Sequence, residues 1–224
     1  MIDLDPLWLT LKLACITTIL LLVIALPLCY WLAFSKFKLK AVAEAMISLP
    51  LVLPPSVLGF YLLIVFSPQN GLGIFLNKYF DLQLVFSFYG LVIASILYSF
   101  PFMINPILSG LKNLPPSLQE ASFVLGKSKF TTLQKILIPN IRPSLLTGIV
   151  MTFAHTLGEF GVVLMVGGSI PKETRVVSIA IYDEVQSMNY GNANIYAIIL
   201  FVFTFIILLF VYLVNNKSNE KTVF

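Results

Sequence analysis

The sequence predicts an all-α polytopic membrane protein with about five transmembrane helices. Of its 224 residues, 58% are hydrophobic and only 11% are charged, whereas a soluble domain usually carries about 25% charged residues. Uncharged stretches of about 20 residues, the length that crosses a bilayer, recur along the chain. The cationic residues gather in a few short segments between these stretches. This composition excludes intrinsic disorder, which needs low hydrophobicity and high charge.

We expect the whole chain, residues 1–224, to form a single transmembrane domain. The expected spans are the apolar centres of the uncharged stretches, at residues 13–35, 49–66, 86–105, 143–159 and 195–214. Residues 160–170 are apolar but too short to span, so they are expected to form a re-entrant segment or a further short buried helix. The N-terminus, MIDLDPLW, is acidic and has no basic segment, so no cleaved signal peptide is expected.

The distribution of positive charge predicts the orientation in the membrane. With the N-terminus outside and the C-terminus in the cytoplasm, ten of the 14 Lys and Arg residues fall inside, where such residues are enriched. These ten are Lys36, Lys38, Lys40, Lys112, Lys127, Lys129, Lys135, Arg142, Lys217 and Lys221. Lys12, Lys78, Lys172 and Arg175 stay outside. The net charge of +4 is therefore a topology signal, and no nucleic-acid binding is expected.

A run of prolines interrupts the second expected span. Three prolines fall within six residues in the segment LPLVLPPS, residues 49–56. Proline removes a backbone hydrogen bond and breaks a helix, and broken spans tend to line transport pathways. Pro54, Pro55 and Ser56 are therefore candidate pathway residues. For Pro27 we favour the simpler interpretation that prolines are more frequent in membrane helices.

The segment 112–142 is the long loop on the predicted cytoplasmic side. Ser117-Leu118-Gln119-Glu120 has the pattern of a capping box, which predicts a helix start. Gly126 follows where a C-terminal cap is expected. A second short amphipathic helix is predicted from about Lys129 to Pro139. Apolar residues on two such helices in the cytosol indicate a surface that binds another protein.

This loop resembles the EAA loop of ABC importer permeases. Glu120-Ala121-Ser122, three residues, Gly126, nine residues and Ile136-Leu137-Ile138-Pro139 follow the family pattern EAA, three residues, G, nine residues, I-x-L-P. Ser122 replaces the second alanine and Ile138 the leucine. The resemblance implies that the loop docks an ATPase subunit through Glu120, Ala121, Ser122, Gly126, Ile136 and Pro139.

Two further stretches resemble molybdate ABC permeases. They are residues 49–63, LPLVLPPSVLGFYLL, and residues 157–161, LGEFG, followed by IPKETR at 170–175, where the usual form is IPGETR. Lys172 stands in the glycine position. The resemblance implies the type I ABC importer permease fold in the cell inner membrane. It also implies a homodimer with two cytoplasmic ABC ATPase subunits and an extracytoplasmic molybdate-binding protein.

The implied function is import of molybdate, or of tungstate, by a non-catalytic membrane subunit. The alternatives are a sulfate or thiosulfate ABC permease, which shares the layout, and a channel or secondary transporter, which would not explain the EAA loop. The sequence contains no GxxxxGK[ST] phosphate-binding motif, so ATP would be bound by the partner subunit and no cofactor is expected. One histidine and two cysteines without nearby carboxylates predict no metal site and no catalytic residues.

Polar and small residues form a stripe on the fourth expected span. At about 100° per residue, Ser144, Gly148, Thr152, His155 and Glu159 lie within about 80° of one another. Such a stripe lines either a water-filled pathway or a packing face between helices. We assign Thr152 and His155 to the pathway wall and Glu159 to an outer gate. Because a carboxylate repels a dianion, Glu159 is expected to pair with Lys172 or Arg175, or to bond the backbone after Gly161.

Overall fold

The structure, a computed structural model, describes residues 3–35 and 37–220, and of their side chains all but those of residues 210, 211 and 214–220. Three of the lysines predicted to lie inside fall outside this description: Lys36, Lys221 and the side chain of Lys217. The described part is helical. Its elements are α1 (Asp5–Phe34), α2 (Lys40–Ser48), the 3-10 turn η1 (Leu49–Leu51), α3 (Pro55–Phe66), α4 (Gly71–Phe80), α5 (Phe88–Lys112), α6 (Pro116–Val124), α7 (Lys129–Thr132), the π-helical turn η2 (Leu133–Leu137), α8 (Ile138–Asn140), α9 (Arg142–Leu157), α10 (Gly161–Gly167), α11 (Val177–Gln186) and α12 (Tyr190–Glu220).

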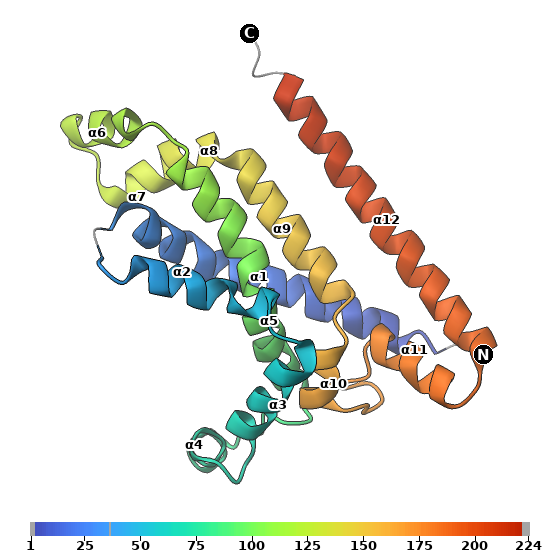
Figure 1. Cartoon of the computed structure of the whole chain (residues 1–224). Helices are drawn as coiled ribbons and strands as arrows, with labels where there is room; N and C mark the ends of the chain where they lie inside the picture. The colour runs from blue at the N-terminus through green and yellow to red at the C-terminus, as the bar shows by residue number, and fades with distance from the viewer. Residues whose placement is uncertain (1–2, 36, 221–224) are drawn as a thin grey trace.

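Helices α1, α5 and α9 pack against one another and form the centre of the molecule. Apolar side chains of all three elements, among them Leu21, Ile104 and Leu145, meet in the largest core cluster. Helix α12 runs beside this bundle and diverges from it toward the C-terminus (Figure 1). Among the described residues, α1, α5 and α12 are long and apolar enough to cross a membrane, and two bent helix pairs raise the number of spans to as many as five.

The second expected span is broken at its prolines. Residues Lys40–Leu51 and Pro55–Phe66 form two helical pieces bent by 107° relative to each other, so residues 49–66 are not one helix. Pro54 is the N-cap of α3 and has extended ψ, which ends the preceding turn. The break predicted from the proline run is therefore confirmed. Helix α2 is tied to the far end of α5 by Lys112 and Glu44, whose charged atoms are 2.8 Å apart.

The fourth expected span is preceded by a second bend. Residues 129–140 are helical and meet α9 at an angle of 81°. The prediction that Pro139 ends the second loop helix is wrong by one residue, because Pro139 takes the second position of the short helix α8 (Ile138–Asn140). Proline is tolerated there, since the first turn of a helix needs no N–H from it. Arg142 and Pro143 then begin α9 in the same manner.

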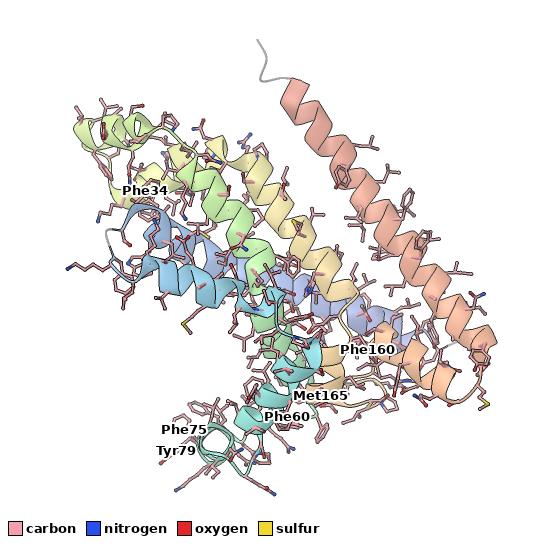
Figure 2. All side chains as sticks on the ribbon, viewed as in Figure 1. Phe34, Phe60, Phe75, Tyr79, Phe160 and Met165 are labelled. Carbon is pink, nitrogen blue, oxygen red and sulfur yellow. The ribbon has the colours of Figure 1, made fainter. Side chains whose placement is uncertain are left out.

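Residues 160–170, expected to be re-entrant or a short helix, contain the helix α10. Val162, Val163 and Val166 of α10 are fully buried. Helix α10 packs against α3, and Figure 2 shows Met165 of α10 near Phe60 of α3. A Cβ added at Gly59 would lie 2.8 Å from the Cβ of Met165. A larger residue than glycine would therefore separate the two helices. The N-terminal ends of α3 and α10 also lie beside each other, at Pro55 and Gly161.

Candidate functional site

A cavity of about 580 Å³ lies where the broken second span meets the end of α9. Its wall consists of Pro55, Ser56, Tyr98, Ala154, His155, Gly158, Glu159, Phe160 and Gly161. A Cβ on Gly161 would lie 2.7 Å from the Cβ of Pro55, so glycine allows this approach of α10 to α3. Of the three candidates in the proline run, Pro55 and Ser56 line the cavity, whereas Pro54 caps α3 just outside it.

His155 is held in the wall by a hydrogen bond and by an aromatic contact. Its Nδ1 lies 2.9 Å from Ser99 Oγ, and its ring stacks on Phe102 with centroids 4.0 Å apart. The Thr156 hydroxyl donates to the Thr152 carbonyl oxygen at 2.9 Å and lies 3.1 Å from Ser99 Oγ. Because each hydroxyl has one hydrogen, Ser99 donates to Thr156 and Nδ1–H of His155 donates to Ser99. Nε2 is then the ring nitrogen left for the cavity.

The stripe predicted on the fourth span divides into two parts. His155 and Glu159 line the cavity, but Ser144, Gly148 and Thr152 are absent from its wall. A Cβ on Gly148 would lie 3.1 Å from a backbone oxygen of α5, and the Ser144 side chain touches a glycine of the same helix. Thr152 is fully buried. The N-terminal half of α9 therefore has the geometry of the packing face that was the alternative interpretation.

Sequence reasoning missed the contribution of α5 to the site. Tyr98 lines the cavity, and its ring lies 4.7 Å from that of His155 between centroids. Ser99 and Phe102 fix His155 from behind. A signal was present, because Ser95 and Ser99 are four residues apart and share one face of an otherwise apolar helix. Polar residues on one face of a span usually point toward the protein interior.

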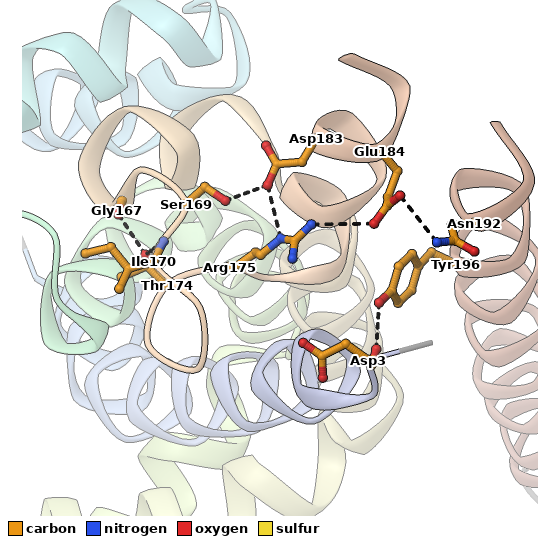
Figure 3. A network of polar contacts seen from close by, with 10 residues as sticks. All are labelled: Asp3, Gly167, Ser169, Ile170, Thr174, Arg175, Asp183, Glu184, Asn192 and Tyr196. Carbon is orange, nitrogen blue, oxygen red and sulfur yellow. Dashed lines mark hydrogen bonds and ion pairs between the residues drawn. The ribbon is translucent and has the colours of Figure 1, made fainter. Parts of the chain in front are cut away.

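A polar network joins the segment after α10 to α11 and α12 (Figure 3). Arg175 Nε lies 3.0 Å from Asp183 Oδ2, and a terminal nitrogen of Arg175 lies 3.8 Å from Glu184 Oε1. The Tyr196 hydroxyl donates to the backbone oxygen of Asp3 at 2.6 Å. These contacts hold the loop, the last helix and the N-terminal residues together at one end of the bundle.

The predicted partners of Glu159 are therefore wrong. Arg175 is engaged in the network, and the Lys172 nitrogen lies 3.8 Å from Asp5 Oδ2. Within the described residues, neither carboxylate oxygen of Glu159 has a hydrogen-bond partner, so the expected bonds to the backbone after Gly161 are also not formed. The reason is geometric: Glu159 turns into the cavity wall, while the loop carrying Lys172 and Arg175 folds onto α11.

The IPKETR segment forms a tight loop that its residues stabilise. Thr174 is fully buried; its hydroxyl donates to the Gly167 carbonyl oxygen at 2.7 Å and accepts from the Ile170 amide at 3.0 Å. Lys172 has φ of 66°, in the left-handed region that favours glycine. This left-handed conformation explains why the usual form of the segment, IPGETR, has glycine where this chain has Lys172.

We expect Lys172→Gly to be more stable than Lys172→Ala by about 1 kcal/mol, because a Cβ is unfavourable at this backbone conformation. Both variants remove the ion pair with Asp5, which is exposed and contributes little. Thermal unfolding midpoints of the two variants in the same detergent measure the difference. An alanine variant as stable as the glycine variant would contradict the strain at Lys172.

The first helix of the EAA loop begins without the predicted capping box. Helix α6 starts at Pro116, its N-cap is Pro115, and no side chain caps it. Glu120 is therefore the fifth residue of α6, two positions beyond the third one that a capping-box glutamate takes, and the N-cap Pro115 has no amide hydrogen to bond. The predicted end is confirmed, because Gly126 has φ of 69°. The Lys127 amide bonds the Ser122 carbonyl at 3.1 Å and the Gly126 amide bonds the Phe123 carbonyl at 2.9 Å, which is a Schellman motif.

The six docking candidates divide into an outward and an inward group. Glu120, Ala121 and Gly126 are exposed. The others, Ser122, Ile136 and Pro139, are buried or half-buried. Ser122 Oγ lies 2.8 Å from Thr132 Oγ1, which itself donates to a backbone oxygen. The serine that replaces the usual alanine therefore has a hydrogen-bond partner inside the loop.

Large apolar side chains surround the glycine turn and face outward. Val124 is 87% exposed, Leu125 74% and Phe130 72%. We call these three residues the apolar loop patch. The loop is fixed to the bundle at its other side, where Gln119 donates to the Tyr30 hydroxyl at 3.2 Å. Clustered exposed apolar residues beside polar ones mark sites of protein association.

A helical bundle with broken spans, a cavity beside one of the breaks and a loop suited to docking defines a multi-pass membrane component of a transport system. Residues 25–220 match the family model described as "Binding-protein-dependent transport system inner membrane component". The chain belongs to this family, whose members are non-catalytic permease subunits of ABC importers. The ATPase of such a transporter is a separate subunit.

Relatives and solved structures agree with this family. The chain is 42% identical over 211 residues to "Molybdenum transport system permease protein ModB" of Azotobacter vinelandii, covering 94% of this chain and 93% of the relative. It is 32% identical to "Probable sulfate transport system permease protein cysT" of Prototheca wickerhamii, covering 93% and 80%. The fold matches a bacterial ABC transporter for import of alginate with a TM-score of 0.79 at 18% identity, covering 96% of this chain and 79% of that one.

Proposed function

We propose that this permease carries molybdate across the cytoplasmic membrane. The observation that carries the proposal is the 42% identity, over nearly the full length of both chains, to a molybdenum permease, against 32% for a sulfate relative. The cavity is compatible with it, because its wall combines Ser56, Tyr98 and His155 with apolar residues and contains no Lys or Arg. Glu159 also belongs to the wall, but both of its carboxylate oxygens are buried. A pathway needs polar groups that a tetrahedral dianion can pass without being trapped.

The functional assembly that we propose contains two copies of this chain, two cytoplasmic ATPase subunits and an external binding protein. The N-terminus lies outside, and the EAA loop faces the cytoplasm. Glu120, Ala121 and the apolar loop patch then form the surface that meets the ATPase. The inward residues Ser122 and Ile136 transmit movement of the loop to the bundle, since Ile136 packs against the core of α1, α5 and α9.

Uptake by the assembled transporter tests the substrate. Permease, ATPase and binding protein are reconstituted in vesicles, and ATP-dependent uptake of radioactive molybdate is measured with excess tungstate or sulfate present. We expect molybdate uptake that tungstate suppresses and sulfate does not. Uptake of sulfate without molybdate would assign the chain to sulfate transport. Uptake that persists without ATP or the ATPase would indicate a channel or secondary transporter.

Accessibility of single cysteines tests the orientation. In a variant lacking Cys15 and Cys29, cysteines placed at Asn77 and Lys172 should react with a membrane-impermeant thiol reagent added outside intact cells. A cysteine at Ser128 should react only after the membrane is opened. All three positions are exposed in the structure, so burial does not limit the reaction. The reverse labelling pattern would place the N-terminus inside.

A further inference from the structure

A second cavity, of about 340 Å³, lies at the C-terminal end of α1 beside the EAA loop. Its wall includes Tyr30, Trp31 and Phe34 of α1, Gln119 and Phe123 of α6, and Lys129 of α7. Figure 2 labels Phe34 at this end of α1. The wall shares no residue with that of the cavity around His155, so the transport pathway proposed above does not account for it.

The aromatic side of this wall is typical of the level where a span meets the lipid headgroups. Tyr30, Trp31 and Phe34 belong to the last two turns of α1, and Trp31 is 45% exposed. Trp and Tyr gather at membrane–water interfaces because each combines an apolar ring with a polar group. Helix α1 ends at Phe34. In the proposed orientation, the cavity therefore lies at the headgroup level of the cytoplasmic leaflet.

Lys129 gives the wall a positive charge that no described residue neutralises. The wall contains no Asp or Glu, and the ion pairs between described residues involve Lys112, Lys172 and Arg175 as cations. The two segments expected beside this membrane surface, 36–48 and 112–142, contain eight Lys and Arg residues but only two Glu. Anionic lipids of the cytoplasmic leaflet attract basic segments of this kind.

A hydrogen bond joins the two sides of the cavity and leaves a further donor. The Gln119 side-chain amide donates to the Tyr30 hydroxyl at 3.2 Å. A tyrosine hydroxyl can donate as well as accept, and that of Tyr30 donates to no described residue. Tyr30 and Lys129 therefore offer an uncharged and a charged donor to an oxyanion in the cavity.

The cavity lies on a different face of α6 from the apolar loop patch. At about 100° per residue, Gln119 of the wall and Val124 of the patch are about 140° apart around the helix. The surface proposed to meet the ATPase thus points away from the cavity, whose other side is the lipid-facing end of α1. A lipid can reach the cavity while the ATPase is bound.

We propose that this cavity binds the headgroup of an anionic phospholipid and that the bound lipid holds the EAA loop against the end of α1. The lipid phosphate accepts from Lys129 and Tyr30, and its glycerol and first chain carbons contact the rings of Trp31 and Phe34. A free phosphate has the same charge but no apolar part for these rings. The choice of leaflet rests on the proposed function, whereas binding depends on neither the substrate nor the ATPase.

Tryptophan fluorescence tests the site, because Trp31 lines it and the sequence has one other tryptophan, Trp8. The Trp8→Phe permease is placed in phosphatidylcholine vesicles with increasing fractions of phosphatidylglycerol whose chains carry bromine, a contact quencher. The reciprocal mixture, brominated phosphatidylcholine in phosphatidylglycerol, measures the neutral lipid. We expect Trp31 to show a preference of about fivefold for phosphatidylglycerol, as one lysine near an anionic headgroup provides.

Matched variants separate the cavity from the general positive charge of the loop. Lys129→Gln should abolish the preference. Lys127→Gln removes the same charge from an exposed position outside the wall and should keep it. In Trp31→Phe, the remaining Trp8 reports the other end of α1 and should show no preference. A wild type without preference, or a Lys129→Gln variant that keeps it, would overturn the proposal.

Two additions test the identity of the occupant. Excess glycerol phosphate, a soluble headgroup without chains, should not displace the brominated phosphatidylglycerol from Trp31. Displacement would mean that the cavity takes a free phosphate and would reject the lipid. The ATPase subunit should also leave the preference unchanged. Loss of the preference on its addition would mean that the ATPase covers the cavity, which would reject the lipid as well.

Uptake tests whether the lipid acts on the loop. ATP-dependent molybdate uptake by the assembled transporter should be faster in vesicles with phosphatidylglycerol than in phosphatidylcholine alone, by at most about fivefold, because a ligand shifts an equilibrium no further than its binding preference allows. Lys129→Gln should lose this difference. Equal uptake in both lipids would reject the action on the loop. If no molybdate enters in either lipid, the proposed substrate fails while the fluorescence result still stands.

Discussion

Replacement of Gly126 by proline is expected to abolish ATP-dependent uptake while leaving the permease in the membrane. The glycine has φ of 69°, and proline is restricted to φ near −65°, so the turn between α6 and α7 cannot form. The Gly126 amide, which bonds the Phe123 carbonyl, is also removed. The apolar loop patch then loses its arrangement on the docking surface. We expect uptake to fall by at least about tenfold, equivalent to about 1.4 kcal/mol in the barrier.

The matched control for this turn is Gly126→Asn. Asparagine adopts the left-handed conformation more readily than other residues with a side chain, and a Cβ at this position meets no atom within 4 Å. The asparagine variant should keep most of its uptake. Uptake and ATP hydrolysis are measured in parallel in vesicles. Wild-type uptake by the proline variant would reject the docking role of the loop.

Glu120→Lys probes the same surface without disturbing the helix. Glu120 is exposed and lies outside the first turn of α6, so its removal breaks no helix cap. Reversal of its charge should weaken binding of the ATPase, and less ATPase should purify with the permease. Glu173→Lys makes the same change in the exposed loop between α10 and α11, on the proposed outer side of the membrane, and should have no such effect. Equal recovery of ATPase by both variants would contradict the assignment of Glu120.

The second large effect is expected at the cavity wall. A cysteine at Ser56, which is exposed and lines the cavity, should react with a bulky thiol reagent, and the reaction should lower uptake by about tenfold, since the added group fills the path. A cysteine at Met151, which is 43% exposed on α9 but absent from the wall, serves as the control. Its modification should leave uptake nearly unchanged.

The same labelling separates the two parts of the polar stripe. A cysteine at His155 should behave like one at Ser56. Cysteines at Ser144 and Thr152 should react slowly, because Ser144 packs against α5 and Thr152 is fully buried. If modification of a cysteine at Met151 blocks uptake while modification of a cysteine at Ser56 does not, the substrate passes on another side of α9.

Sequence patterns predicted the helical class, the broken second span and the glycine turn of the loop, because each depends on local properties. Proline removes a backbone donor wherever it stands, and only a few residues accept a positive φ. The capping box was a wrong prediction because Pro115 is the N-cap and Pro116 the first helical residue, so the helix starts two positions earlier than it would with Ser117 as the N-cap. Two competing local signals at a helix start cannot be ranked from spacing alone.

The candidate site was predicted only in part because it depends on which helices meet. Periodicity placed His155 and Glu159 on one face, but it could not tell that α5 covers the rest of that face. It also could not show that Arg175 turns toward Asp183 and away from Glu159. These contacts join residues from distant parts of the chain, and no local pattern encodes them.

The proline break has a consequence for insertion of the chain into the bilayer. A helix that starts in hydrocarbon exposes up to four amide donors, and each unsatisfied one costs several kcal/mol. At the start of α3 the Pro55 nitrogen carries no hydrogen, and the amides of Val57 and Leu58 both bond the Pro54 carbonyl oxygen. Only the amide of Ser56 is left without a bond to a described backbone oxygen. The two prolines therefore lower the free-energy cost of inserting an interrupted span into the bilayer. The break between η1 and α3 then leaves one amide donor at the start of α3, that of Ser56, without a backbone partner among the described residues.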